Sequence, residues 1–239
     1  MKQNFAVTGN VKRFVSAVDA VVKAPPRIDR MALVYGPPGL GKTETALWWW
    51  NQNMGSGAVY VRTKKLMTGR WLLQDLVKEL GEAPAHLTKD LFQQAQDILL
   101  NTDRVVILDE VDYLTHDARV IETLRDLHDI CRSPFIFIGM DQADAKLKRY
   151  RHLWRRFSQV VRFDHLSRED VRGVMDQICE VELADDVAGH ICNAYPNGIT
   201  VANLNRWALA IEAKARRQGI SKVSAAVLEA PKETGDGRG

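Results

Sequence analysis

The sequence predicts an α/β protein with a three-layer core, built on a five-stranded, mostly parallel sheet, and a small all-helical region after it. Two observations predict this fold. Short apolar runs that suit buried strands alternate with helical patterns as far as Phe163, and only helical patterns follow. We therefore expect an α/β nucleotide-binding core over residues 1–164, a helical lid over 165–230 and a disordered tail over 231–239.

The composition is that of an ordinary globular protein. Of the 239 residues, 46% are hydrophobic and 26% are charged. The formal net charge is only +3, so any contact with nucleic acid must come from local basic patches. The cysteines Cys131, Cys179 and Cys192 lack metal-site spacing, and their odd number fits a reducing cytosol. No apolar run approaches the roughly 18 residues of a membrane span. We expect a cytoplasmic protein without membrane contact.

The first elements lead into a phosphate-binding loop. Asn10 can cap a helix with an apolar face from Val11 to Val22, and the apolar run Met31–Tyr35 suits a buried strand. The next eight residues match the pattern G-x-x-x-x-G-K-[ST]: Gly36, Pro37, Pro38, Gly39, Leu40, Gly41, Lys42 and Thr43. Backbone N–H groups of such a loop bind phosphate oxygens, and the following helix adds its dipole. Lys42 should reach the β- and γ-phosphates of ATP, and the Thr43 hydroxyl should bind Mg²⁺.

A second decisive stretch is a buried strand that ends in two carboxylates. The apolar run Val105–Leu108 is followed directly by Asp109 and Glu110. Parallel strands place such residues at the carboxyl edge of the sheet, beside the phosphate loop. Asp109 is the candidate for holding Mg²⁺, and Glu110 is the candidate general base.

The other expected elements complete the alternation. They are a strand at 58–62, helices at 71–80, 88–100 and 117–131, strands at 134–139 and 160–163, and lid helices beginning after Ser167 and at 184–194, 200–217 and 221–229. Asp141 follows the fourth strand, where it can either cap the next helix or face the γ-phosphate.

Two basic segments are candidates for contacts with phosphates. The turn after the second strand carries Lys64, Lys65 and Arg70, which can either follow a DNA backbone or form an ordinary solvated turn. Arg119 is a weaker candidate. Six basic residues and no acidic residue lie between Lys146 and Arg156.

The motifs quoted above resemble those of the AAA+ ATPases, a superfamily with an α/β core and a helical lid. The details are similar to those of the transposition ATPases: the phage Mu B-type target-DNA activators and their IstB-like and TniB-like relatives. Three features carry this resemblance: the small lid, the basic segment Arg62–Arg70, and the run Ile138-Gly139-Met140 with Leu153-Trp154-Arg155-Arg156-Phe157 after it. The resemblance covers about residues 5 to 229.

The resemblance implies roles for particular residues. Lys42 and Thr43 match the nucleotide-binding pair, and Asp109 and Glu110 match the metal-binding and catalytic acids. Arg155 or Arg156 matches the arginine finger that acts on a neighbouring subunit's ATP, with Arg156 favoured because it directly precedes Phe157.

The sequence departs from the family pattern in two places. Met140 stands where the family usually has a polar sensor, and the segment 198–201 lacks the lid's sensor arginine. Both departures predict slow hydrolysis, or hydrolysis that needs DNA or a partner. The helix-turn-helix domain of Mu B-type proteins is expected to be absent or encoded elsewhere.

The resemblance implies an ATPase that uses ATP and Mg²⁺, forms a helical or ring oligomer on double-stranded DNA without sequence preference, and delivers target DNA to a transposase. Its setting would be the cytoplasm of a bacterial host cell. The alternative is a helicase loader or initiator that acts mainly on a protein partner. A third possibility is an AAA+ ATPase with no DNA function.

Overall fold

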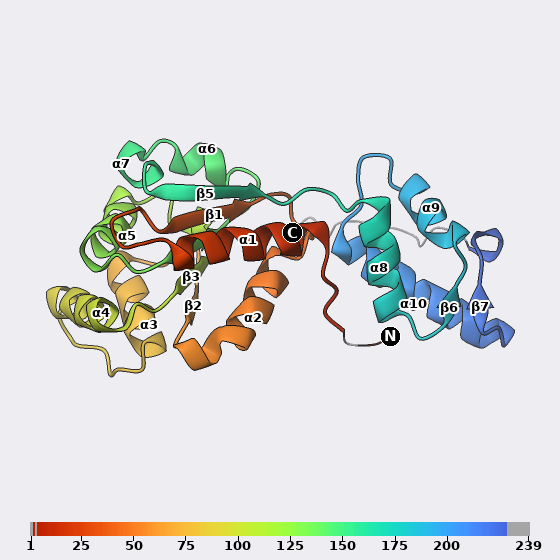
Figure 1. The fold of residues 1–239 in the computed structure, drawn as a ribbon, viewed down its shortest axis with the longest axis horizontal. Coiled ribbons are helices and arrows are strands. Elements are labelled where there is room, and N and C mark those ends of the chain that lie inside the picture. The colour runs from red at the N-terminus through yellow and green to blue at the C-terminus, as the bar shows by residue number, and fades with distance from the viewer. Residues whose placement is uncertain (1, 3, 229–239) are drawn as a thin grey trace. The chain divides into compact units, whose positions relative to one another are not determined.

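The computed structural model describes residues 2 and 4–228 of the chain (Figure 1). It divides into two compact units. One comprises residues 13–38 and 42–163, and the described part of the other comprises residues 2, 4–12, 39–41 and 164–228. The boundary at residue 164 proposed from the sequence stays a prediction, and the expected tail at 231–239 lies outside the described residues.

The larger unit is built on a five-stranded parallel sheet with the order β2-β3-β4-β1-β5. Its strands are β1 Met31–Tyr35, β2 Val59–Arg62, β3 Val106–Asp109, β4 Phe135–Ile138 and β5 Phe157–Arg162. Every strand pair is parallel, so all five carboxyl ends meet at one edge. The predicted three-layer P-loop fold is confirmed.

The helices occupy both sides of this sheet. They are α1 Gly9–Lys23, α2 Lys42–Asn53, α3 Gly69–Glu79, α4 Thr88–Thr102, α5 Ala118–Cys131, α6 Ala143–Leu147 and α7 Arg151–Trp154, with short 3₁₀ turns η1 Met54–Ser56 and η2 Val111–Tyr113. Helices α3, α4 and α5 pack together on one side, and α1 runs across the front in Figure 1.

Alternate strand residues explain why both faces need covering. Leu33, Leu108 and Phe137 belong to the core cluster shared with α3, α4 and α5. The residues between them, such as Ile107 and Ile136, are also fully buried. Strands buried on both faces are continuous apolar runs, which is why the sequence predicted them well.

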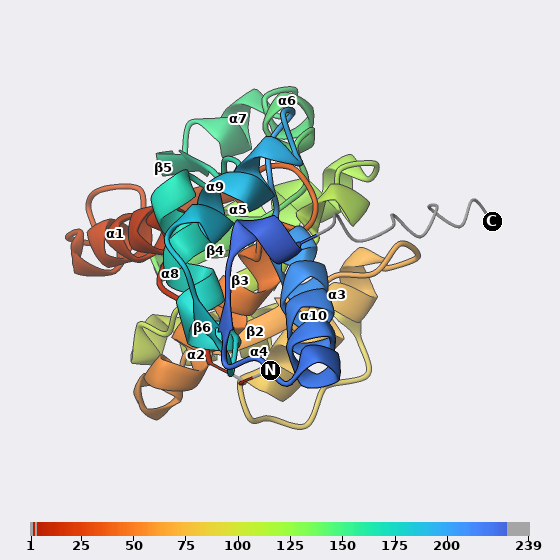
Figure 2. The same cartoon turned by 90° about the vertical axis from the view of Figure 1, so that its right-hand side faces the viewer.

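The C-terminal unit contains α8 Arg168–Ile178, β6 Glu182–Leu183, α9 Asp186–Asn193, α10 Val201–Gln218, β7 Lys222–Val223 and η3 Ala225–Val227 (Figure 2). Capping boxes begin α8 at Ser167 and α10 at Thr200. The helix expected at 221–229 is wrong, because β7 pairs there with β6.

Two local predictions in the rest of the chain also need correction. Asn10 lies inside α1 rather than before it, and its side-chain amide donates to the carbonyl of Asp164. Strand β5 begins at Phe157, earlier than expected. None of the described helices is both long and apolar enough to cross a membrane.

Candidate functional site

The phosphate loop joins the carboxyl end of β1 to the first turn of α2. Its glycines Gly36, Gly39 and Gly41 have φ angles of 151°, 77° and 81°, which favour glycine. At Gly36 there is also no space for a side chain, because a Cβ atom would lie 2.5 Å from the carbonyl oxygen of Phe163. The loop conformation therefore depends on these glycines.

Lys42 directs its ammonium group back into this loop. Its side-chain Nζ donates to the carbonyls of Gly36 at 2.7 Å and Pro37 at 2.8 Å, and the residue is only 8% exposed. Burial lowers the pKa of the Lys42 ammonium, and the negative charge of Asp109 opposes this shift. A cation held inside a loop with these φ angles is suited to binding phosphate.

Asp109 lies at the centre of a compact hydrogen-bond network at the end of β3. Its Oδ2 accepts from the Thr43 hydroxyl at 2.8 Å and from the Tyr60 hydroxyl at 2.6 Å, and its Oδ1 accepts from the Glu110 N–H at 2.8 Å. Asp109 is only 2% exposed. The structure thus brings together Thr43 and Asp109, the two residues predicted to hold the metal.

Tyr60 was missed by the sequence reasoning. Burial and the hydrogen bond to Asp109 hold the pKa of its phenol well above the usual range, so it acts as a neutral donor. The signal for it is the pairing of β2 with β3, in which Arg62 lies opposite Asp109 and Tyr60 lies two residues earlier on the same face.

Glu110 leaves the strand with a φ angle of 59°, which is uncommon for a residue other than glycine. Its carboxylate accepts from the guanidinium of Arg62 at 2.7 Å. Its carbonyl accepts from the Thr63 hydroxyl at 2.6 Å, and the Thr63 N–H donates to the carbonyl of Asp109 at 2.9 Å. The candidate base is therefore tied to the segment that follows β2.

The chemistry of these groups fits a nucleotide with Mg²⁺. The Thr43 hydroxyl and the Asp109 carboxylate offer the oxygen ligands that Mg²⁺ prefers, and they already lie within hydrogen-bond distance of each other. The Lys42 ammonium supplies positive charge for the phosphates.

Asp141 does not cap the helix after β4, because the N-cap of α6 is Gln142. The Asp141 carboxylate instead lies 3.3 Å from the guanidinium of Arg162, and both side chains are about half exposed. The negative charge of Asp141 acts to raise the pKa of Lys42. The role of Asp141 beside the nucleotide stays a prediction.

The basic turn after β2 is anchored on both sides. The Met67 N–H donates to the carbonyl of Lys64 at 2.9 Å, and Met67 is buried. The Lys64 ammonium is 3.3 Å from Asp75 and lies over the Trp71 ring. Lys65 and Arg70, by contrast, are exposed and make no ion pair within the described residues. Arg119, the weaker candidate, pairs with its neighbour Asp117 at 3.3 Å.

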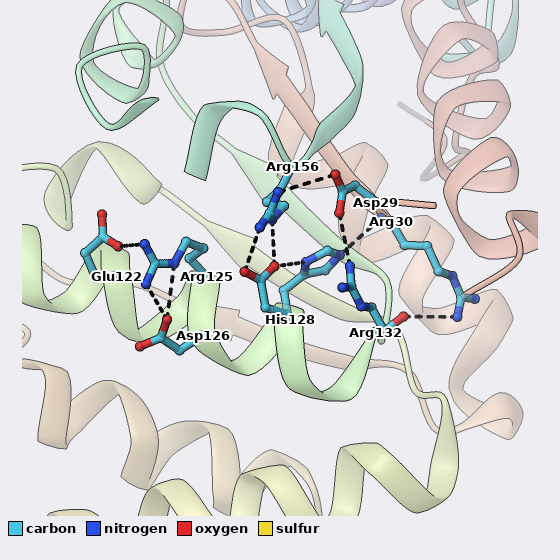
Figure 3. Close-up of polar contacts among 9 residues, drawn as sticks. Asp29, Arg30, Glu122, Arg125, Asp126, His128, Arg132 and Arg156 are labelled. Carbon is cyan, nitrogen blue, oxygen red and sulfur yellow. Dashed lines mark hydrogen bonds and ion pairs between the residues drawn. The ribbon is translucent and has the colours of Figure 1, made fainter. Parts of the chain in front are cut away.

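Arg155 and Arg156 precede β5 and therefore lie at the amino edge of the sheet, opposite the phosphate loop. Arg156 donates to both oxygens of Asp129 at 2.6 and 2.9 Å, and lies 3.8 Å from Asp29 (Figure 3). Arg155 is exposed and has no such partner in the described chain. This argues against our preference for Arg156 as the arginine finger, because Arg156 would have to leave Asp129 first.

The same edge holds Asp29, His128 and Asp129, whose ligand atoms lie within 4.8 Å of one another. Their donors and acceptors are already used. Besides Arg156, Arg132 donates to Asp29 at 3.2 Å, and the Nε2 of His128 accepts from the Arg30 N–H at 3.1 Å. The cluster is a structural ion network rather than a metal site.

Comparison with known proteins identifies the family to which the chain belongs. A family model described as an AAA domain matches residues 27–147, about half of the chain. A potential ATP-binding protein of Staphylococcus aureus is 26% identical over 203 residues, covering 73% of this chain and 72% of that protein. The replication factor C large subunit of Thermofilum pendens is 27% identical over 180 residues, covering 72% of this chain but only 37% of that protein.

Several solved structures share the fold. Aeropyrum pernix ORC1, in complex with DNA, superposes with a TM-score of 0.63 at 16% identity over 90% of this chain and 61% of that one. Domain III of the Thermotoga maritima initiation protein DnaA gives 0.59 at 19% identity over 94% and 91%. Cdc6p of Pyrobaculum aerophilum gives 0.63 at 15% over 93% and 66%.

Proposed function

The chain belongs to the AAA domain family of P-loop ATPases, and from this premise we propose that it is an ATP-driven switch of the initiator or helicase-loader type, which assembles on duplex DNA and acts on a protein partner. The observation that carries the ATPase part is the contact between the Thr43 hydroxyl and Asp109 at 2.8 Å, beside the buried Lys42. The named replication proteins among its relatives and fold neighbours support the rest.

In the proposed mechanism, the loop 36–41 and Lys42 would bind and neutralise the phosphates, while Thr43 and Asp109 would hold Mg²⁺. The bound metal would neutralise charge that develops on the phosphate oxygens. Tyr60 keeps Asp109 oriented through its hydrogen bond of 2.6 Å. Glu110 orients the attacking water and accepts its proton once its carboxylate is released from Arg62.

Asp112, the next carboxylate after Glu110 in the sequence, is less suited to that role. Its Oδ2 accepts from the Met140 N–H at 2.5 Å, and Lys146 lies 3.5 Å from its Oδ1. A nearly buried carboxylate that already accepts a backbone hydrogen bond and faces a lysine ammonium is a poor acceptor for a water proton.

Two variants test the ATPase assignment. Lys42→Ala should abolish ATP binding because it removes the cation inside the loop. Glu110→Gln should keep ATP bound and lower hydrolysis by roughly 10²-fold or more. Equilibrium binding of a fluorescent ATP analogue and single-turnover hydrolysis measure the two effects. Full ATP affinity in Lys42→Ala would contradict the assignment.

Delivery of duplex DNA to a transposase is the second candidate function. The exposed Lys65 and Arg70 on the turn after β2 would serve it as well as they would serve an initiator. Stimulation of hydrolysis by duplex DNA would exclude a function without DNA. Direct binding assays against a replicative helicase and against a transposase then separate the two candidates.

A further inference from the structure

The end of β4 lies between the phosphate loop after β1 and the acidic residues Asp109 and Glu110 at the end of β3. In the sheet order β2-β3-β4-β1-β5, strand β4 lies between the acid strand β3 and the strand β1 that leads to the phosphate loop. The residue that follows β4 by two positions is Met140, which is 43% exposed. Its thioether cannot donate a hydrogen bond to phosphate or water. This position therefore lacks the polar group that the family pattern would place there.

Asp112 fastens this end of β4 to the acid loop. It lies in the η2 turn directly after Glu110, and its Oδ2 accepts from the Met140 N–H at 2.5 Å. Because Asp112 lies so close to β4, there is no space for a side chain at Gly139. A Cβ atom there would lie 2.9 Å from Oδ2 of Asp112 and 2.4 Å from the Cβ of Ala143. The Asp112 side chain is only 10% exposed. Its carboxylate is therefore a fixed, nearly buried charge.

The other oxygen of Asp112 is incompletely satisfied. Among the described residues, Oδ1 is buried and accepts no hydrogen bond. The Lys146 ammonium lies 3.5 Å away and is 37% exposed. Lys146 is carried by α6, which packs against both β1 and η2. A buried carboxylate thus holds a partly solvated lysine loosely at the carboxyl edge of the sheet.

We propose that Lys146 binds the terminal phosphate of ATP from the β4 side, in place of the polar side chain that Met140 lacks, and that Asp112 positions it. This inference rests on the proposed ATP site. A lysine on a flexible stem can turn from a carboxylate toward a phosphate while keeping its charge in the same region. Asp112 meanwhile keeps its hydrogen bond to Met140. A cation aimed at charge that builds up in the transition state accelerates the reaction.

Two other cations of this region, Arg162 and Lys148, have acidic partners among the described residues. Arg162 pairs with Asp141 at the end of β5, the outer strand beyond β1. Lys148 follows α6 directly, but it pairs with Asp144 at 2.8 Å and lies over the Trp154 ring. Lys148 is therefore a matched control for the loss of one lysine from the same segment.

The experiment compares Lys146→Met, Lys146→Arg and Lys148→Met in ATP binding and in single-turnover hydrolysis. Lys146→Met should keep ADP affinity unchanged and ATP affinity within about threefold, while hydrolysis falls 10- to 100-fold, in line with the loss of one stabilising group. Lys146→Arg should recover most of the rate because it keeps the charge. Lys148→Met should behave as the unmodified protein.

Asp112→Asn gives a second, independent measurement. Asparagine still accepts from the Met140 N–H, so the end of β4 stays in place, but the charge that holds Lys146 is gone. We expect a smaller loss of rate than in Lys146→Met, and no additional loss when the two changes are combined.

A wild-type hydrolysis rate in Lys146→Met would overturn the inference, as would equal losses of ADP and ATP affinity. Equal losses in Lys146→Met and Lys148→Met would also overturn it. The proposed function fails differently, because it fails when the unmodified protein does not bind or hydrolyse ATP.

Discussion

The contact between Arg62 and Glu110 occupies the carboxylate of the candidate base. The guanidinium lies 2.7 Å from the carboxylate, and the two side chains are 60% and 31% exposed. Exposed ion pairs of this kind are worth up to about 1 kcal/mol, so the pair can be broken by a competing anion. Arg62 also ends β2, directly before the basic turn, where phosphates of DNA would supply that anion.

We therefore predict that Arg62→Ala raises ATP hydrolysis in the absence of DNA by about threefold to fivefold, the equivalent of up to about 1 kcal/mol. The same change should reduce further stimulation by DNA. Steady-state hydrolysis with and without duplex DNA measures both effects. Lys23→Ala, which removes another exposed ion pair, should change neither. An unchanged basal rate in Arg62→Ala would show that the contact does not restrain Glu110.

Only some residues of the candidate site can be identified from the sequence, and the reason is physical. The spacing of the phosphate loop and the acid strand is local, so Lys42, Thr43 and Asp109 can be found from the sequence. Tyr60 and Arg62 enter the site through the register of β2 against β3, which no local pattern encodes. The ion pairs of Lys64 and Arg156 are likewise tertiary contacts.

At the scale of elements, the amino edge of the sheet is held by polar groups rather than by apolar packing alone. Arg30 is only 2% exposed and donates to the carbonyls of Val21 and Val22 in α1 and to Asp103 after α4. It also donates to the carbonyl of Arg132 after α5 (Figure 3). One side chain thus satisfies carbonyl groups at two helix ends and joins three helices.

His128 makes this edge sensitive to acid. It is fully buried, its Nε2 accepts from the Arg30 N–H, and burial lowers its pKa despite the nearby charges of Asp129 and Asp29. The stability that neutral His128 contributes is complete above pH 6.5, its ordinary pKa. It is lost as the pH falls below that value, because the unfolded chain takes up a proton that the folded chain does not.

The free energy of unfolding should therefore decrease by up to about 1.4 kcal/mol per pH unit between pH 6.5 and 5.5 through this residue. In His128→Gln, the amide oxygen can still accept from Arg30, and the dependence on pH should weaken. Urea unfolding at pH 7.5 and 5.5 measures the change. His86→Gln at an exposed histidine is the control, and equal pH dependence in both variants would contradict the assignment.

The elements that the sequence predicted poorly depend on partners far along the chain. Strand β5 alternates between partly buried and exposed residues, so its first half has no continuous apolar signal. The pair β6 and β7 joins Glu182 to Lys222 and Leu183 to Val223. Two-residue strands form only because the partner is present, and the local pattern at 221–229 indicated a helix instead.

At the scale of the whole molecule, the position of Arg155 and Arg156 predicts ATP sites that are shared between neighbouring subunits. Arg155 lies at the edge opposite the phosphate loop, so we expect it to act on the ATP of a neighbouring subunit. Mixing Arg155→Ala subunits with Lys42→Ala subunits should then restore some complete sites, and the mixture should hydrolyse more ATP than the two variants do separately. Arg156→Ala subunits in the same mixture should behave differently, because their loss breaks the pair with Asp129 and lowers stability. No gain in the Arg155→Ala mixture would place the finger elsewhere.

Binding to DNA should depend on a few residues, because the chain carries a net charge of only +3. Within the basic turn, Lys65 and Arg70 are the main candidates for contacts with DNA phosphates, because Lys64 is paired with Asp75. Changing Lys65 and Arg70 together to Ala should weaken binding to unrelated duplex sequences, because contacts with the backbone carry no sequence information.

The same double variant should lower the dependence of log affinity on log salt by about 0.9 for each lost phosphate contact per subunit. ATP affinity should be unchanged, since the turn is separate from the phosphate loop. The measurement is affinity for random duplexes in the presence of a non-hydrolysable ATP analogue across a series of salt concentrations. Lys64→Ala is the matched control, and its slope should fall less because Asp75 already neutralises that lysine. If both variants keep the slope of the unmodified protein, the turn is a solvated surface, and Arg119 and the exposed cations between Lys146 and Arg156 become the next surfaces to test.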